Sequence, residues 1–228
     1  MQRALLNLCF ACHSILYHLT GCFVKKSYLN LDHDLSADME IYLPTKNLPL
    51  VVVSNHQSAF DISSIVLSFP KRRIFFVAKK ELLWTPTISV FIKRYNGIPI
   101  DRSAPSEAIR IISEKVADLI TTVPLEELGI AIFPEGTRSK DGNLKNFKST
   151  GLSVCLTALK KACIVPVVFT ENHKFGKIGH NNCQSEMIML KPEIFDASLH
   201  DPSLFIDKIF ENMLNTFDCY RSRKIYKI

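Results

Sequence analysis

The sequence predicts an α/β fold with a mostly parallel central sheet and helices on both of its faces. From residue 50 onward, short apolar runs of strand length alternate with amphipathic stretches of helical period, a pattern typical of parallel sheets covered by helices. The most strand-like run, Val51-Val52-Val53, is β-branched throughout and ends in small polar residues that suit a loop. A length of 228 residues suffices for one such domain with a substantial core.

The N-terminal segment is predicted to attach the chain to a membrane. Residues 4–24 contain no Asp, Glu, Lys or Arg, and basic residues flank them at Arg3 and Lys25-Lys26. The segment would just span a bilayer, but its polar residues fall on one stripe of a helix: Asn7, Ser14, His18 and Gly21. We therefore expect residues 1–26 to form a membrane-attachment helix that lies in the interface or inserts as a hairpin. A single span and a helix docked on the protein itself are the alternatives.

Residues 27–228 are expected to form a single domain. A polar surface connector reaches residue 50 and includes a short strand at 39–43. Further strands are expected at 51–53, 74–78, 98–100, 129–133, 164–169 and 186–190, and helices at 84–95, 106–121 and 151–161. A last amphipathic helix begins near residue 202, and the basic tail at 221–227 is expected to be frayed.

His56 and Asp61 form the candidate catalytic pair. His56 follows the triple-valine strand, and open α/β sheets bind ligands at the carboxyl ends of such strands. Asp61 lies five residues further on, within the first turns of the next helix, so a turn between them could fold the carboxylate back onto the imidazole. A neutral imidazole can accept a proton from a substrate hydroxyl, and the carboxylate holds its tautomer. The alternative is a histidine that only caps the helix, beside a solvated aspartate.

A second candidate loop, residues 134–139, follows the expected strand at 129–133 and has the sequence PEGTRS. Gly136 lets the backbone turn sharply or approach a ligand closely, Thr137 adds a hydroxyl, and Arg138 offers a planar fork of donors suited to a phosphate monoester. Glu135 could orient Arg138 or a substrate hydroxyl. The alternative is a surface turn with an incidental ion pair between Glu135 and Arg138.

Two further strand ends carry cations. The strand at 98–100 contains Pro99, which has no amide proton and so predicts a sheet edge or a bulge, and this strand is followed by Arg102. Lys79 and Lys80 follow the strand at 74–78. Each of these cations could bind phosphate. A salt bridge of Arg102 with Asp101 or with a partner on a helix surface, and lysines that are merely solvated, are the alternatives.

Charge and motif content limit the classes of function. The net charge of +6 suits lipid headgroups, phosphate esters or nucleic acid without choosing among them. The sequence contains neither a P-loop nor a GxGxxG fingerprint, which argues against nucleoside triphosphate and dinucleotide chemistry, and it lacks the GxSxG elbow of α/β-hydrolases. Its seven cysteines show no metal-binding arrangement and are expected to be reduced.

Taken together, these blocks resemble the PlsC-like glycerolipid acyltransferase family. Residues 55–61, NHQSAFD, are similar to its NHxSxxD block, and residues 133–139, FPEGTRS, match its FPEGTRS block throughout. Residues 97–102, GIPIDR, and 164–167, IVPV, resemble its third and fourth blocks, and residues 78–82, AKKEL, also have a counterpart there. Order and spacing agree across roughly residues 50–170, most closely with bacterial 1-acyl-sn-glycerol-3-phosphate acyltransferases.

The resemblance implies a glycerol-3-phosphate acyltransferase-like fold and a specific reaction. A fatty acyl group would pass from acyl-CoA or acyl carrier protein to the sn-2 hydroxyl of 1-acylglycerol 3-phosphate, giving phosphatidic acid. His56 would be the general base and Asp61 its orienting partner, without a covalent acyl-enzyme. The residues that hold the acceptor phosphate would be Glu135, Gly136, Thr137, Arg138, Arg102, Lys79 and Lys80.

The same resemblance implies the partners and the location of the protein. The expected partners are a lipid substrate, a membrane surface and either form of acyl donor, with no nucleic acid, no metal and no redox cofactor. The expected location is the cytoplasmic face of the inner (plasma) membrane. The acceptor could also be another lysolipid or glycerol 3-phosphate. A thioesterase-like hydrolase and a non-catalytic lipid-binding module are the alternatives outside acyl transfer.

One block departs from the family pattern. The family usually has Phe-Lys-x-Gly after its arginine block, whereas residues 147–151 here read FKSTG, with Thr150 in the place of the glycine. Thr150 is expected to act as a helix cap, since threonine is a good residue for that position.

Overall fold

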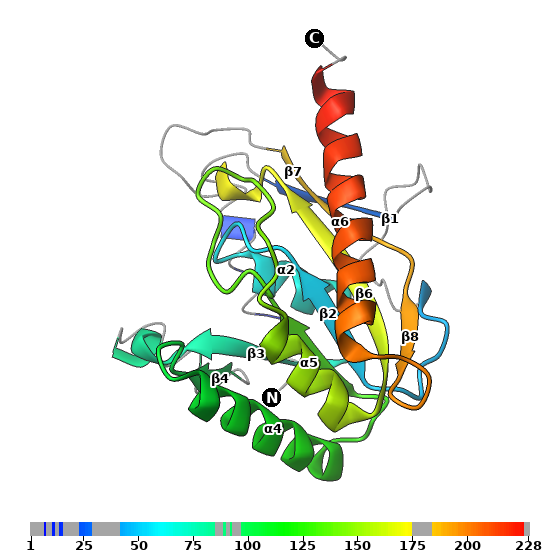
Figure 1. Ribbon diagram of the computed structural model, residues 1–228. Helices are drawn as coiled ribbons and strands as arrows, with labels where there is room; N and C mark the ends of the chain where they lie inside the picture. The colour runs from blue at the N-terminus through cyan, green and yellow to red at the C-terminus, as the bar shows by residue number, and fades with distance from the viewer. Residues whose placement is uncertain are drawn as a thin grey trace.

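The protein is built on one mixed sheet, seen in a computed structural model that describes residues 23–28, 42–84, 97–174 and 184–225, together with residues 7, 11, 14, 15, 89 and 92. The sheet has eight strands in the order β1-β7-β6-β2-β5-β3-β4, and β8 pairs with β6 (Figure 1). The strands are β1 (Phe23–Tyr28), β2 (Leu50–Ser54), β3 (Arg73–Lys79), β4 (Gly97–Ile100), β5 (Leu128–Ile132), β6 (Lys161–Thr170), β7 (Gln184–Met189) and β8 (Glu193–Asp196).

Most of the sheet is parallel, as the sequence predicts. The neighbouring strands β6, β2, β5, β3 and β4 all run in one direction. Strands β7 and β8 run antiparallel to β6, and β1 runs parallel to β7. Strand β4 ends the row and pairs with β3, so Pro99 lies in an edge strand, where its missing amide proton interrupts no ladder on the open side.

Helices cover both faces of the sheet and divide the core into two layers. The side chains of Val51 and Val53 belong to a cluster that also holds α4 (Pro105–Thr122), α5 (Ser149–Leu159) and α6 (Pro202–Ile225). The alternate residues Leu50 and Val52 belong to the opposite cluster with α2 (Asp61–Ser68). This division follows from the period of two along a strand, and both faces of β2 are fully buried.

The structure corrects several of the predicted elements. Lys161 begins β6 where the sequence predicts the end of a helix, and α6 continues to Ile225 through most of the tail expected to be frayed. Strand β8 was not predicted. The described part of the expected strand at 39–43, Tyr42 and Leu43, is not extended; residues 39–41 lie outside the described residues. In the expected helix at 84–95, Trp84 ends the 3₁₀ helix η2 (Lys80–Trp84), while Ser89 and Ile92 are helical.

The membrane-attachment helix expected at 1–26 is wrong for residues 23–26, which belong to a strand. Most of its other residues lie outside the described part of the chain. Phe23 begins strand β1, which pairs with β7 in register over its whole length. Residues 7, 11, 14 and 15 are helical and exposed. Within the described part of the chain, no helix combines the length and the apolar character needed to cross a bilayer.

Asn55 locks the carboxyl end of β2 to β6. Its side-chain amide donates to the carbonyl of Phe169 at 2.9 Å and its side-chain oxygen accepts from the Phe169 amide at 2.7 Å. Asn55 is completely buried, so both backbone groups of Phe169 depend on this one side chain. The two bonds fix the point at which the chain leaves the sheet, one residue before His56.

Candidate functional site

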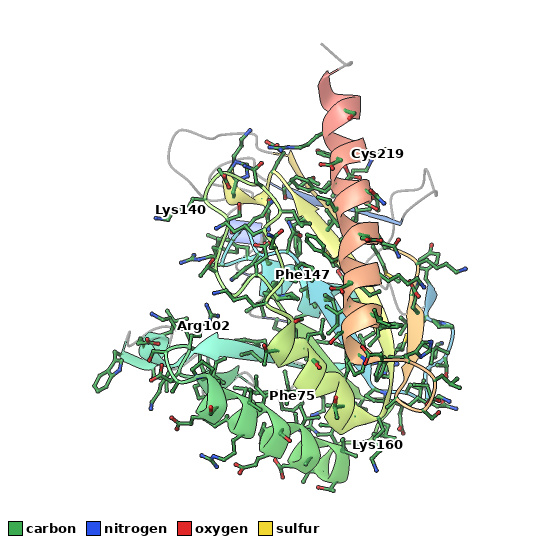
Figure 2. All side chains as sticks on the ribbon, in the orientation of Figure 1. Phe75, Arg102, Lys140, Phe147, Lys160 and Cys219 are labelled. Carbon is green, nitrogen blue, oxygen red and sulfur yellow. The ribbon has the colours of Figure 1, made fainter. Side chains whose placement is uncertain are left out.

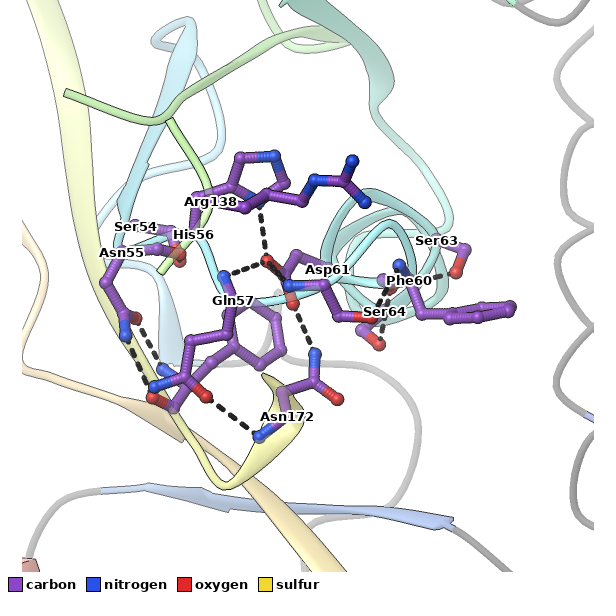
Figure 3. A network of polar contacts seen from close by, with 12 residues as sticks. Ser54, Asn55, His56, Gln57, Phe60, Asp61, Ser63, Ser64, Arg138 and Asn172 are labelled. Atoms are coloured by element: carbon purple, nitrogen blue, oxygen red, sulfur yellow. Dashed lines mark hydrogen bonds and ion pairs between the residues drawn. The ribbon is translucent and has the colours of Figure 1, made fainter. Parts of the chain in front are cut away.

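The structure brings His56 and Asp61 together at the end of β2. Nδ1 of His56 lies 2.7 Å from Oδ2 of Asp61, which is the first residue of α2 (Figure 3). Asp61 is fully buried, while 17% of the His56 side chain is exposed. The predicted turn is therefore confirmed, and the alternative of a solvated aspartate is wrong.

The carboxylate of Asp61 is saturated with donors. Oδ2 accepts the backbone N–H groups of Gln57 at 2.7 Å and Ser58 at 2.9 Å, in addition to the imidazole, and Oδ1 accepts from the side-chain amide of Asn172. Because every neighbour of the carboxylate donates, the hydrogen-bond network assigns a proton to Nδ1 of His56. A neutral ring with its proton on Nδ1 has an unprotonated Nε2, on the side facing away from Asp61 (Figure 3). Nε2 is then the atom that can accept a proton.

Sequence reasoning missed three residues that hold this pair. Asn172, in the 3₁₀ helix η3 (Asn172–Lys174), lies far from Asp61 in the sequence and follows β6, so no local pattern marks it. The side-chain oxygen of Gln57 accepts from the backbone amide of Asn172 at 2.8 Å, and its side-chain nitrogen donates to the Gly142 carbonyl at 2.8 Å. Phe133 stacks on the imidazole with the ring centroids 4.2 Å apart. Asn172 and Gln57 thus hold the carboxylate and its loop, and Phe133 covers one face of the ring.

A pocket of about 380 Å³ joins the imidazole to the predicted cations. His56, Lys79, Arg102 and Arg138 all line it. The remainder of its wall is apolar and comes mainly from β3, η2 and the start of α2: Ala59, Ile62, Phe76, Val77, Ala78, Leu82, Ile92 and Phe133. The pocket thus combines one base, three cations and a long apolar surface, which suits an amphipathic molecule with an anionic end.

Arg102 and the loop after β5 are joined directly. The guanidinium of Arg102 donates to the carbonyl of Gly136, which adopts a positive φ of 71° that favours glycine. No ion pair joins Asp101 to Arg102; the Asp101 carboxylate instead accepts from the amide and hydroxyl of Ser103 at 2.8 and 2.6 Å. These hydrogen bonds lower the pKa of Asp101. The predicted alternative of an Asp101–Arg102 salt bridge is therefore wrong.

Glu135 is a buried residue of this loop, and no ion pair joins it to Arg138. It is 3% exposed, and its Oε1 accepts from the backbone amide of Lys145 at 3.2 Å. Burial raises the pKa of Glu135 to about 7, an effect that the backbone N–H groups of Lys145 and His56 partly offset. The predicted surface turn with an incidental Glu135–Arg138 ion pair is wrong, and Arg138 instead lines the pocket.

The backbone also joins the two main blocks, since the Ser139 amide donates to the His56 carbonyl at 2.7 Å. Two of the predicted site residues, Thr137 and Lys80, are exposed and do not line the pocket, whereas Lys79 lines it and pairs with Glu81 at 3.1 Å. Thr150 is not a cap: α5 begins at Ser149, and its N-cap position is Lys148.

Comparison with known proteins identifies relatives of this chain. Residues 38–170, more than half of the chain, match the model of the acyltransferase family. The 1-acyl-sn-glycerol-3-phosphate acyltransferase alpha of Homo sapiens is 34% identical over 176 residues, which cover 74% of this chain and 59% of the human protein. The 1-acyl-sn-glycerol-3-phosphate acyltransferase of Cocos nucifera is 37% identical over 127 residues, covering 56% of this chain and 39% of the plant protein. The chain thus spans about half the length of these curated relatives.

A solved structure shares the fold. The crystal structure of the 1-acyl-sn-glycerophosphate (LPA) acyltransferase PlsC from Thermotoga maritima superposes with a TM-score of 0.66 at 20% sequence identity, covering 96% of this chain and 79% of that one. At this identity the likeness shows the fold, and it agrees with the α/β architecture that the sequence predicts and with the acyltransferase-like fold that the resemblance implies.

We expect the substitution Glu135→Gln to stabilise the protein at high pH. The folded-state pKa of Glu135 is about 7, above the ordinary value of 4.5 that applies in the unfolded chain. The free energy of unfolding therefore falls as pH rises from 4.5, and the loss is complete above pH 7, where Glu135 is ionised in both states. The variant should gain up to about 3 kcal/mol in free energy of unfolding relative to the parent across this window. Urea unfolding at several pH values measures it. Glu126→Gln, at an exposed position, is the control; equal pH dependence in both variants would contradict the assignment.

Proposed function

The chain belongs to the acyltransferase family, and we propose that it transfers a fatty acyl group from an acyl thioester to the sn-2 hydroxyl of 1-acylglycerol 3-phosphate, giving phosphatidic acid. The observation that carries this proposal is the shared pocket. One wall presents Nε2 of His56, held by Asp61, and the same space is bordered by Arg102, Arg138 and apolar side chains. A lysophospholipid offers a hydroxyl, a phosphate and a hydrocarbon chain, which these three features fit.

The proposed reaction needs one proton acceptor and no protein nucleophile. Nε2 of His56 takes the proton from the acceptor hydroxyl while the oxygen of that hydroxyl attacks the thioester carbonyl carbon. The tetrahedral intermediate collapses with cleavage of the carbon–sulfur bond, and the leaving thiolate receives the proton from the imidazolium. Asp61 stabilises the imidazolium between these steps and keeps the ring in the tautomer that exposes Nε2. The donated acyl group ends as an ester on the acceptor.

The cations of the pocket are proposed to hold the acceptor phosphate. Arg138 extends beside the imidazole in Figure 3, and Arg102 is tied to the same loop through Gly136. A guanidinium fork can bind two phosphate oxygens at once, which fixes the orientation of the hydroxyl as well as its distance from the base. Lys79 borders the same space and adds charge, while Lys80 and Thr137 would act at the rim.

The donor and the location belong to the same proposal. Either acyl-CoA or acyl carrier protein would deliver the acyl group, and an amphipathic acceptor that partitions into bilayers would be met at a membrane surface. The proposed site of action is the cytoplasmic face of the inner membrane. Basic residues on the loop after β5, Lys140, Lys145 and Lys148, are exposed and would attract either anionic donor.

An acyl-transfer assay tests the function. Purified protein would be given acyl-CoA and a panel of acceptors, namely 1-acylglycerol 3-phosphate, other lysophospholipids and glycerol 3-phosphate, while free thiol release is followed in parallel. We expect thiol release to depend on 1-acylglycerol 3-phosphate and to match the phosphatidic acid formed. Thiol release with free fatty acid as the product would instead identify a thioesterase-like hydrolase.

We expect His56→Ala to reduce kcat for acyl transfer by roughly 10²- to 10⁴-fold, the usual contribution of a general base. The fold should remain intact, because the ring is partly exposed and Asp61 retains its three other donors. His200→Ala, at an exposed position next to α6, is the matched control for loss of a histidine. Wild-type turnover in a folded His56→Ala protein would remove His56 from the role of base.

We expect Arg138→Ala to raise KM for the phosphorylated acceptor by roughly 10- to 100-fold, the loss of a charge-assisted hydrogen bond. The KM for acyl-CoA should change little. Steady-state kinetics with each substrate varied in turn separates the two effects. Arg110→Ala is the control, since Arg110 is an exposed residue of α4 that pairs with Glu114 and does not line the pocket. A change confined to the donor's KM would place Arg138 at the donor site instead.

A further inference from the structure

We propose that Trp84, at the end of η2, is an interfacial anchor that docks the mouth of the pocket onto an anionic lipid surface. The inference rests on the proposed function, because an acceptor lipid must reach the pocket from a bilayer. It goes beyond the N-terminal attachment expected from the sequence, since it assigns a second contact at the opposite edge of the sheet from β1, beside β3 and β4.

The exposure of Trp84 is the first observation. Its side chain is 85% exposed, the largest fraction among the large hydrophobic residues that the structure describes. It is also the only tryptophan in the chain. Indole combines an apolar body with one N–H donor, and such side chains concentrate at the level of lipid headgroups.

The position of η2 is the second observation. This short helix follows β3 directly, beyond the tip of β3 at the left of Figure 1. Leu82 faces the pocket and lines it, and both Leu82 and Leu83 pack against the core cluster that includes α2. One side of η2 is therefore part of the pocket wall, whereas Trp84 projects into solvent from the same short segment. A lipid surface bound by Trp84 would lie at the entrance to the pocket.

The local charge favours an anionic surface as the occupant. Lys79, Lys80 and Arg102 lie at the ends of β3 and β4 around η2, and Figure 2 labels Arg102 at this end of the molecule. Two carboxylates are close to them. Glu81 pairs with Lys79 at 3.1 Å, and Asp101 is bonded to Ser103. Among the described residues around η2, these three cations outnumber the two carboxylates, and Lys80 is exposed, so this surface attracts negatively charged headgroups.

Fluorescence tests the contact directly, because all tryptophan emission from this 228-residue chain comes from Trp84. The probes are vesicles of phosphatidylcholine alone, vesicles of phosphatidylcholine with phosphatidylglycerol, and the mixed vesicles carrying brominated acyl chains. We expect the mixed vesicles to shift the emission to shorter wavelength and the brominated chains to quench it, with a smaller effect from neutral vesicles.

Two outcomes of this experiment would overturn the proposal. Emission that keeps its water-exposed wavelength while the protein sediments with mixed vesicles would show that Trp84 does not touch the lipid. A shift that appears without vesicles and grows with protein concentration would assign this surface to a second copy of the chain. Neither outcome depends on enzymatic activity.

A kinetic comparison distinguishes the anchor from the catalytic site. We expect Trp84→Ala to raise the apparent KM for an acceptor embedded in mixed vesicles by roughly 5- to 10-fold, about the contribution of one interfacial aromatic side chain. Turnover of a short-chain, freely soluble acceptor should be unchanged. Leu199→Ala is the control, since Leu199 is 78% exposed in the loop before α6, on the right of Figure 1. Equal effects of the two variants, or equal losses on both acceptors, would contradict the proposal; an inactive parent protein would instead reject the proposed function.

Discussion

The ionised carboxylate of Asp61 is the interaction on which the site depends. It is fully buried, and its stability there comes from donors supplied by a turn of its own loop, by the imidazole of His56 and by the amide of Asn172. An ionised oxygen surrounded only by donors leaves the imidazole one arrangement, with the proton on Nδ1. Whatever chemistry His56 performs therefore takes place at Nε2, on the pocket side.

Parallel pairing explains why the rest of the site gathers around that nitrogen. Strands β2, β5, β3 and β4 run in the same direction, so the residues that follow them all lie at the carboxyl end of the sheet. His56, Arg138, Lys79 and Arg102 come from four different strand ends and line one pocket. The Asn55 side chain then fixes the loop of His56 to β6, and the Ser139 amide fixes the loop of Arg138 to the His56 carbonyl.

The sequence was sufficient for the parts of the fold and site that local patterns encode. Periodicity predicted the five parallel strands and α4, α5 and α6, and the five-residue spacing of His56 and Asp61 allowed the contact that the structure shows. Asn172 could not be predicted, because a single asparagine after a strand is an ordinary turn residue until the sheet order places it against Asp61. Strand β1 was missed for a different reason. Its sequence, FVKKSY, joins the end of an apolar segment to two lysines, and its pairing with β7 is a long-range choice that overrides the local helical pattern.

The most direct measurement of the central claim is the protonation pattern of the His56 ring by ¹⁵N nuclear magnetic resonance, at a pH where the ring is neutral. We expect the signals of a ring protonated at Nδ1, with Nε2 unprotonated, and loss of this preference in an Asp61→Asn protein. A ring protonated at Nε2 in the unaltered protein would contradict the account, because the atom that faces the pocket could then donate a proton but not accept one.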